Sequence, residues 1–332
     1  AAQVRRLARA LGAAVVSSPA GKRWLGHRDP TYRGVVGFSG HGEAQRAIER
    51  ADVIVAFGAT FDELSTNAWT VLPKVPVFAV DAHSEFAYRL SQARPVVAPT
   101  ELVIQRLLDR LRPPLVPSIT PRSFSGMQPV KERVDDAAPV HPSRLMQWLG
   151  QVLPDDVVVH VDAGNSFSWS TRDLSRPCAD TYRVAMGLAT MCWAISAVVG
   201  AAIGRGRRTL CITGDGSMLM SSLELTVAVE QQLPVTYIVL NDSALGMVRH
   251  GQKLSGAAPI AFEIANVRFD QLAAACGAYG VRVERNSELE TIDRRWLSAD
   301  DGGPCVIDVR IDREAVPPMA DRVRGLAEGV PR

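Results

Sequence analysis

The sequence predicts an α/β protein with two doubly wound parallel-sheet domains. Its 332 residues exceed what one ordinary hydrophobic core accommodates. Short apolar runs alternate with amphipathic helical patterns along most of the chain, which is typical of parallel sheets covered by helices. A proline-rich stretch at residues 113–138 interrupts this alternation and indicates a linker.

The first predicted domain covers residues 1–112. Its helical patterns lie at residues 4–12, 43–51 and 101–111, and its strand patterns at residues 13–18, 52–58 and 75–80. Because strands and helices alternate here, a parallel sheet is expected.

The second predicted domain covers residues 139–332. Helical patterns are expected at residues 143–153, 191–204, 221–232 and 269–280, and strands at residues 156–162, 209–215, 235–242 and 305–311. Ligands of such sheets bind outside the carboxyl ends of the strands. Asp162, Asp215 and Asp242 all occupy such ends.

Composition excludes several functional classes. Hydrophobic residues make up 47% of the chain and the net charge is +2, so neither nucleic acid nor an anionic membrane surface is an expected partner. No apolar run approaches the roughly 20 residues of a membrane span, and residues 1–12 resemble an amphipathic helix rather than a signal peptide. The five cysteines have no CxxC spacing, which predicts free thiols and a cytoplasmic location.

Two neighbouring strands are expected to end in acidic groups. The first ends in Gly214-Asp215-Gly216-Ser217 and the second in Asn241-Asp242-Ser243. The glycines allow close approach of a ligand to the backbone, and the helix that starts at Ser217 favours a phosphate. Mg²⁺ between carboxylate and diphosphate makes the two anions compatible, since Mg²⁺ binds carboxylate and phosphate oxygens. A glycine-flanked aspartate alone is also a common turn.

These stretches resemble the thiamine diphosphate-dependent enzymes of the acetolactate synthase and pyruvate decarboxylase type, over essentially the whole chain. The strongest matches are "GDGSMLMSSLELTVAVEQQLPV", "VLND" and "LGMV", with support from "VAFGATFDE" and "CVIDVRID". The resemblance implies a central domain at residues 1–112 and a diphosphate-binding domain at residues 139–332. It implies Asp215, Asp242 and the carbonyl of Ala244 as Mg²⁺ ligands, although the family usually has asparagine at Asp242 and Asn241 stays an alternative. Cofactor contacts are implied for Gly214, Gly216, Ser217, Leu245, Gly246 and Met247.

Two further segments fit this resemblance. Gly164, Asn165 and Ser166 in "VDAGNSF" resemble the loop that holds the diphosphate, with an ordinary strand-to-helix turn as the alternative. Met191 in "MGLATMCWAISAVVG" resembles the apolar residue that wedges between the two rings of the cofactor. A methionine in an apolar segment is otherwise a core residue.

An acceptor pocket is expected after the metal loop, in "LGMVRHGQKLSG". Gly251 stands where acetolactate synthases have a bulky tryptophan, which suggests room for a larger acceptor. His250 and Gln252 are candidates to hydrogen-bond an intermediate, with a solvated loop as the alternative. Arg249 is expected on the surface.

The resemblance leaves FAD open for the first domain. "GFSGHGE", "GATFDE" and Asp81 resemble FAD-contacting positions of acetolactate synthases. Thr60, however, stands where the synthases have arginine, and many relatives keep this domain without a nucleotide.

The function implied is decarboxylation of a 2-oxo acid with acyl transfer to an aldehyde or ketone acceptor. Alternatives are simple decarboxylation and a non-catalytic scaffold. The family's glutamate that contacts the aminopyrimidine belongs to a pyrimidine-binding domain not recognised in this sequence, and Glu224 is expected to be structural. A separate chain with that domain, in a hetero-oligomer, is therefore expected to complete the site.

Overall fold

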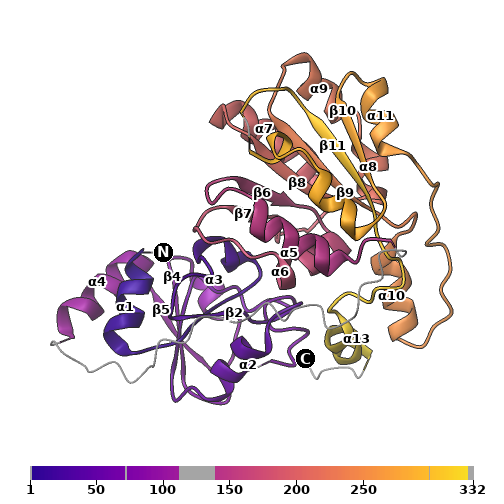
Figure 1. The fold of residues 1–332 in the computed structure, drawn as a ribbon. Helices are drawn as coiled ribbons and strands as arrows, with labels where there is room; N and C mark the ends of the chain where they lie inside the picture. Colours follow the sequence, from indigo (N-terminus) through magenta and orange to yellow (C-terminus); the bar gives the residue numbers. More distant parts are fainter. Residues whose placement is uncertain (1, 72, 112–138, 299, 328–332) are drawn as a thin grey trace. The chain divides into compact units, whose positions relative to one another are not determined.

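The computed structural model describes residues 2–71, 73–111, 139–298 and 300–327. The chain divides into two compact units, one within Ala1–Gly126 plus Asp321–Arg332 and the other within Met127–Ala320. Every pairing between the described strands is parallel (Figure 1). The predicted fold class is thus confirmed, while the predicted linker lies outside the described residues.

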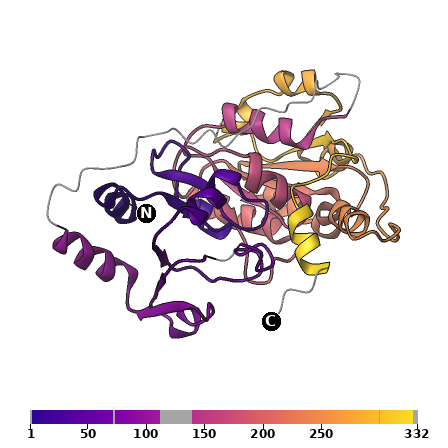
Figure 2. The same ribbon diagram turned by 90° about the horizontal axis from the view of Figure 1, so that it is seen from below.

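The first unit contains a two-stranded sheet of order β1-β2 and a three-stranded sheet of order β3-β4-β5. Its helices α1 and α4 pack against one another (Figure 2). Strands β2 and β5, which the sequence did not predict, have the sequences YRGV and ARPVV, in which charged residues, glycine or proline interrupt the apolar pattern. The elements are α1 (Ala2–Leu11), β1 (Val15–Ser17), η1 (Ala20–Trp24), β2 (Tyr32–Val35), α2 (Gly42–Glu49), β3 (Ile54–Phe57), β4 (Val77–Asp81), α3 (Ser84–Ala87), β5 (Ala93–Val97) and α4 (Thr100–Arg110).

The helix α13 (Ala320–Ala327) joins this first unit, although it is distant in sequence. The Arg322 guanidinium donates to both carboxylate oxygens of Glu63, at 2.6 and 3.1 Å. It also lies 5.5 Å from the ring centroid of Phe38. The predicted domain boundaries at residues 112 and 139 stay predictions, and α13 falls within the range predicted for the second domain.

The second unit is a six-stranded sheet of order β10-β11-β9-β8-β6-β7. The order reverses between β6 and β8, where doubly wound sheets open a crevice for ligands. Its elements are α5 (Pro142–Val152), β6 (Val158–Val161), α6 (Asn165–Asp173), β7 (Tyr182–Val184), α7 (Trp193–Arg205), β8 (Thr209–Gly214), α8 (Asp215–Ser221), α9 (Glu224–Glu230), β9 (Val235–Asn241), α10 (Gly246–Leu254), α11 (Phe269–Ala275), β10 (Tyr279–Val283), η2 (Asn286–Thr291), α12 (Arg295–Ser298) and β11 (Cys305–Arg310).

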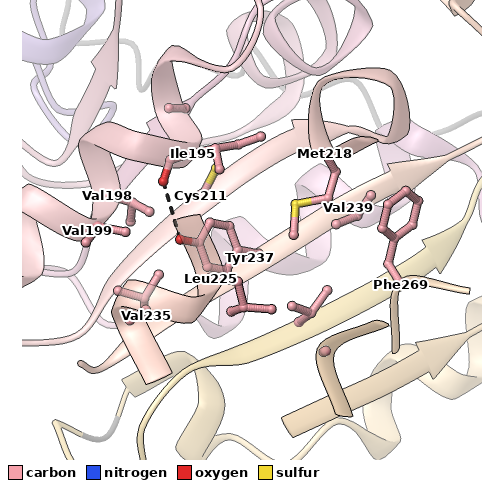
Figure 3. Packing of buried hydrophobic residues seen from close by; sticks show 14 of the residues in the cluster. Ile195, Val198, Val199, Cys211, Met218, Leu225, Val235, Tyr237, Val239 and Phe269 are labelled. Atoms are coloured by element: carbon pink, nitrogen blue, oxygen red, sulfur yellow. Dashed lines mark hydrogen bonds between the residues drawn. The ribbon is translucent and has the colours of Figure 1, made fainter. Parts of the chain in front are cut away.

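A hydrophobic core fixes the central strands of the second unit (Figure 3). All seven residues of β9 are buried, as expected for a parallel strand covered on both faces. Cys211 of β8 and Val239 of β9 pack with side chains from α7, α8 and α11. The Tyr237 hydroxyl donates to the Ile195 carbonyl at 3.3 Å, which ties α7 to β9. The carboxyl ends of β8 and β9 are therefore held rigidly.

Helix α7 is the most apolar helix of the second unit. It has thirteen residues, whereas a membrane span needs about 20. In the part of the chain that the structure describes, no helix has the length and apolar character needed to cross a membrane.

Candidate active site

The carboxyl ends of β6, β8 and β9 form one edge of the sheet. Gly214 pairs with Leu240, so Asp215 follows beside Asn241 and close to Asp242. Val161 pairs with Ile212, which places Asp162 beside Thr213. The register thus brings the three predicted aspartates to one edge.

Asp215 and Asp242 are direct neighbours at this edge. The Asp242 backbone amide donates to Oδ2 of Asp215 at 3.2 Å, and the Gly216 amide donates to Oδ1 at 2.8 Å. Their residues are only 3% and 6% exposed. Two carboxylates thereby share a small, desolvated volume at the start of α8.

This environment disfavours negative charge. Burial, together with the charge of Asp242, raises the pKa of Asp215 to about 7. Burial also raises the pKa of Asp242 to about 6, opposed by its backbone hydrogen bonds and by Arg313. Within the described residues, no lysine or arginine lies within ion-pair distance of either carboxylate. A divalent cation would supply the missing positive charge, so the donor set fits Mg²⁺.

The side chain of Asn241 is directed elsewhere. Its Nδ2 donates to the Val267 carbonyl at 3.0 Å and to Asp308 Oδ1 at 2.8 Å, and its Oδ1 accepts from Arg310 at 2.5 Å. All its polar atoms are engaged within the protein. The geometry therefore favours Asp242 over Asn241 as the metal-facing member of the pair.

Described side chains alone do not complete a metal site. No group of three or more His, Cys, Asp or Glu side chains with metal-binding geometry occurs among the described residues. The remaining oxygen ligands of Mg²⁺ would come from a backbone carbonyl, a bound anion or water. Ala244, the predicted carbonyl ligand, is buried and follows Ser243, whose φ of 55° turns the chain sharply. Its role as a ligand stays a prediction.

Gly164 and Asn165 form the turn at the start of α6. Gly164 has φ 83° and ψ −153°, a conformation essentially confined to glycine. Oδ1 of Asn165 is buried and has no hydrogen-bond partner, an arrangement that is costly without a ligand. A Cβ on Gly246 would lie 2.5 Å from Nδ2 of Asn165 and 2.8 Å from Oδ2 of Asp242. Gly246 thus lets the loop, α10 and the carboxylate pair converge.

Ser166 and Ser217, both predicted contacts, are buried. The Ser166 hydroxyl donates to the carbonyls of Asp162 and Ala163, at 3.1 and 2.7 Å. The hydroxyl hydrogen of Ser166 therefore stabilises the turn, and Ser166 can donate to a ligand only through its backbone amide. Ser217 lies in the first turn of α8, beside Gly216.

Apolar side chains gather over Gly216. A Cβ on this glycine would lie 2.8 Å from Leu245 Cδ2, 3.3 Å from Met191 Cε and 3.9 Å from Ile264 Cδ1. Met191 is 37% exposed, so it is not a core residue. The position of Ile264 near Gly216 could not be predicted from the sequence, because a single isoleucine in a loop belongs to no periodic pattern. A Cβ on Gly214, by contrast, meets nothing within 4 Å and its φ is −89°.

The predicted acceptor residues lie on α10. His250 is buried, and burial, then the charges of Arg249 and Lys253, lower its pKa. Oε1 of Gln252 accepts from the Ile260 amide at 3.0 Å, and its Nε2 donates to the Ile260 carbonyl at 3.3 Å. Roles for His250 and Gln252 in an acceptor pocket stay predictions. At Gly251 a Cβ meets only Met319 Cε, at 3.8 Å, so the side-chain space there is open.

The prediction that Arg249 lies on the surface is wrong. Its residue is 6% exposed. The guanidinium donates to the Arg313 carbonyl and to Glu314 Oε1, and it lies 5.7 Å from the ring centroid of Phe262. Arg249 fastens α10 to the segment that follows β11.

Two of the glycines in the segments suggested as FAD contacts, Gly37 and Gly40, have internal packing roles. A Cβ on Gly37 would lie 2.4 Å from the Leu64 carbonyl oxygen, and one on Gly40 would lie 2.6 Å from that of Val35. Asp81 accepts from the His83 amide at 2.8 Å. FAD binding to this unit stays a prediction.

Comparisons with known proteins identify the family. Residues 1–107 match the model of the thiamine pyrophosphate enzyme central domain, and residues 162–309 match that of the C-terminal TPP binding domain. The chain is 28% identical over 295 residues to the acetolactate synthase isozyme 2 large subunit of Escherichia coli (strain K12), covering 85% of this chain and 52% of that protein. It is 26% identical over 326 residues to the putative thiamine pyrophosphate-containing protein YdaP of Bacillus subtilis (strain 168), covering 95% and 55%.

Two solved structures share the fold. A thiamine diphosphate-dependent 4-hydroxybenzoylformate decarboxylase from Rhodococcus jostii RHA1 matches with a TM-score of 0.76 at 24% identity, over 95% of this chain and 59% of that one. Benzoylformate decarboxylase from Polynucleobacter necessarius matches with a TM-score of 0.78 at 22% identity, over 95% and 60%. The chain spans about half the length of the two curated relatives. On its matched central and C-terminal domains, the chain belongs to the thiamine pyrophosphate enzyme family.

Proposed function

We propose that this chain holds Mg²⁺-thiamine diphosphate in an enzyme that decarboxylates a 2-oxo acid and transfers the acyl unit to an aldehyde or ketone. The observation that carries the proposal is the buried carboxylate pair Asp215 and Asp242 at adjoining strand ends. This pair lacks a cation among the described side chains, and a bound Mg²⁺ would neutralise it. The likeness to acetolactate synthase large subunits supports the carboligase reaction.

Different residues of the second unit would bind the metal, the diphosphate and the rings of the cofactor. Asp215, Asp242 and the Ala244 carbonyl hold Mg²⁺, while Gly164, Asn165 and the first amides of α8 receive the diphosphate. Met191 and Leu245, whose ends lie beside Gly216, would support the cofactor rings. When bound, the cofactor supplies the carbanion chemistry and the protein supplies orientation and a dry pocket.

A further domain completes this site in our proposal. Met191 is 37% exposed, and Leu188, Met220 and Leu223 are 85%, 68% and 72% exposed in the same unit. These exposed apolar side chains are available to contact another protein surface. We propose that this surface is a pyrimidine-binding domain, on a separate chain or elsewhere in the same protein.

The reaction is tested by incubating the chain and a pyrimidine-binding domain with pyruvate, Mg²⁺ and thiamine diphosphate. Products are measured with and without an aldehyde acceptor. Acceptor-dependent formation of a 2-hydroxyketone supports the carboligase. Release of free acetaldehyde alone would identify a simple decarboxylase, the reaction named for the two matched structures.

A scaffold without catalytic function is tested in the same assembly. Asp215→Ala removes a metal ligand and should abolish turnover, whereas Asp301→Ala changes an exposed aspartate of the same unit. Full activity of the Asp215→Ala assembly would mean that this chain does not supply the metal site.

A further inference from the structure

The carboxylate of Asp162 is hydrogen-bonded to the start of α7 and to β8. Its Oδ2 accepts from the Cys192 amide at 3.0 Å and from the Thr213 hydroxyl at 3.1 Å. Its Oδ1 accepts from the Ala194 amide at 3.2 Å. Asp162 is 1% exposed. It therefore bridges three elements, since Asp162 follows β6, Thr213 belongs to β8 and Ala194 to α7.

The segment that Asp162 holds is strained. Cys192 has φ 75° and ψ −9°, a left-handed conformation that costs a non-glycine residue free energy. Both amides that Asp162 accepts, those of Cys192 and Ala194, lie at the start of α7, where helix amides have no internal partner. An acidic group there also interacts favourably with the helix dipole.

The strained residue is joined directly to Met191. The Met191 Cε lies 3.3 Å from the position that a Cβ on Gly216 would occupy. The Cys192 thiol donates to the Ser217 carbonyl at 3.5 Å, so the turn also contacts α8. The position of Met191 over α8 depends on the conformation at Cys192.

The body of α7 has an independent anchor. The Tyr237 hydroxyl donates to the Ile195 carbonyl, and Ile195 and Val198 are buried against β8 and β9 (Figure 3). A substitution at Asp162 should therefore release the Cys192 turn while most of α7 stays in place. This separation makes a local function of Asp162 measurable.

We infer that Asp162 is a positioning residue: it holds the Cys192 turn in its left-handed conformation and thereby sets Met191 against the cofactor rings. The inference rests on the proposed function, because it concerns the thiamine diphosphate site. It extends that function by separating recognition of the rings from recognition of the Mg²⁺-diphosphate. Asp162 serves recognition of the rings, and Asp215 and Asp242 serve recognition of the Mg²⁺-diphosphate.

The first test measures the turn itself by hydrogen exchange of the wild-type chain, Asp162→Asn and Thr213→Val. Asparagine keeps the size of the side chain but loses the charge and one acceptor oxygen. Exchange should accelerate in peptides covering residues 188–194, by roughly tenfold in Asp162→Asn and less in Thr213→Val, with residues 198–204 unchanged. Thr213→Ser keeps the hydroxyl and should resemble the wild type. Unchanged exchange at residues 188–194 would overturn the inference.

The second test compares two ligands by calorimetry with the same chain, Mg²⁺-thiamine diphosphate and Mg²⁺ with inorganic diphosphate. Asp162→Asn should weaken the first by roughly tenfold and leave the second unchanged. Met191→Ala should have the same selective effect, and Asp162→Asn should add nothing in the Met191→Ala background. Equal weakening of both ligands, or full additivity with Met191→Ala, would show a general structural role and overturn the inference. Absence of thiamine diphosphate binding by the wild-type chain even after addition of a pyrimidine-binding domain would instead overturn the proposed function.

Discussion

At the scale of single residues, two buried carboxylates at neighbouring strand ends carry an electrostatic cost when no cation is bound. The pKa of Asp215 is raised to about 7 and that of Asp242 to about 6. In the unfolded chain both groups return to their ordinary pKa near 3.8. The folded state therefore binds more protons than the unfolded state between these values, and its stability falls as the pH rises.

We expect the free energy of unfolding without metal to fall between about pH 4 and pH 7 and then to level off. Asp242→Asn removes one of the two charges, so the fall should become shallower and the variant should gain about 2 kcal/mol at pH 8. Urea unfolding in EDTA at several pH values measures this. Adding Mg²⁺ should stabilise the wild-type chain more than the variant.

The control is Asp301→Asn, the same substitution at an exposed aspartate of the second unit. It should leave the pH profile unaltered. Identical profiles for the wild type and Asp242→Asn would show that folding does not raise the pKa of Asp242.

At the scale of structural elements, the two glycines of the GDG motif differ. The sequence predicted that both allow close approach of a ligand. Only Gly216, in the first turn of α8, is crowded by neighbouring side chains, whereas Gly214 has an ordinary extended backbone and open space around it. The two glycines differ in the space around them, because the side chains of Met191 and Leu245, which are distant in sequence, lie beside Gly216 only.

Gly216→Ala should weaken Mg²⁺-thiamine diphosphate binding by about tenfold, because its Cβ would displace the ends of Leu245 and Met191. These ends are flexible, so the loss of stability should stay within about 1 kcal/mol. Gly214→Ala, the matched substitution two residues earlier, should retain the fold without clashes. Calorimetric titration and thermal unfolding of both variants measure these effects. Equal losses of stability in Gly216→Ala and Gly214→Ala would contradict the packing of apolar side chains against Gly216.

The packing of strand β10 against the start of α11 predicts a larger effect. A Cβ on Gly280 would lie 2.0 Å from the Asp270 carbonyl oxygen, a backbone atom that cannot move without shifting the start of α11. Gly280→Ala should therefore destabilise the second unit by 3 kcal/mol or more, by an order-of-magnitude estimate for forced backbone shifts. Gly204→Ala on α7 meets no neighbouring atom and should be neutral or stabilising. Urea unfolding distinguishes them, and a Gly280→Ala variant of wild-type stability would contradict the predicted clash.

At the scale of the whole molecule, the second unit alone holds the proposed metal and diphosphate residues, on one edge of its sheet. Met191 remains partly exposed. The proposed function therefore requires cover for the cofactor rings from a further domain.

The isolated chain should bind Mg²⁺-thiamine diphosphate weakly and show no turnover of pyruvate, since water is not excluded from the rings. Addition of a pyrimidine-binding domain should restore affinity and rate together, because the cofactor would contact both. Cofactor titration and pyruvate consumption by the isolated and mixed proteins measure this. Substantial turnover by the isolated 332-residue chain would contradict the requirement for a further domain.

The sequence by itself determined the fold class and most elements of the second unit. The largely apolar run 235–241 defines β9 because a parallel strand is buried on both faces. The positions of Asp215 and Asp242 at strand ends followed from the same pattern. The strands β2, β5, β7 and β10 were not predicted, because they are short or contain arginine, glycine or proline. Their pairing comes from neighbouring strands rather than from local propensity.

Only the tertiary structure decided what each polar side chain contacts. Asn241 and Asp242 are adjacent in sequence, yet Asn241 bonds to Asp308 and Arg310 while Asp242 lies beside Asp215. Successive side chains of a strand point to opposite faces of the sheet. The partners on β11 therefore bind Asn241 on one face and leave Asp242 beside Asp215. The same holds for Asp162, whose partners at Cys192 and Ala194 are 30 and 32 residues away. Residue type and spacing predict a site at this edge, whereas contacts between distant segments determine the orientation of each group.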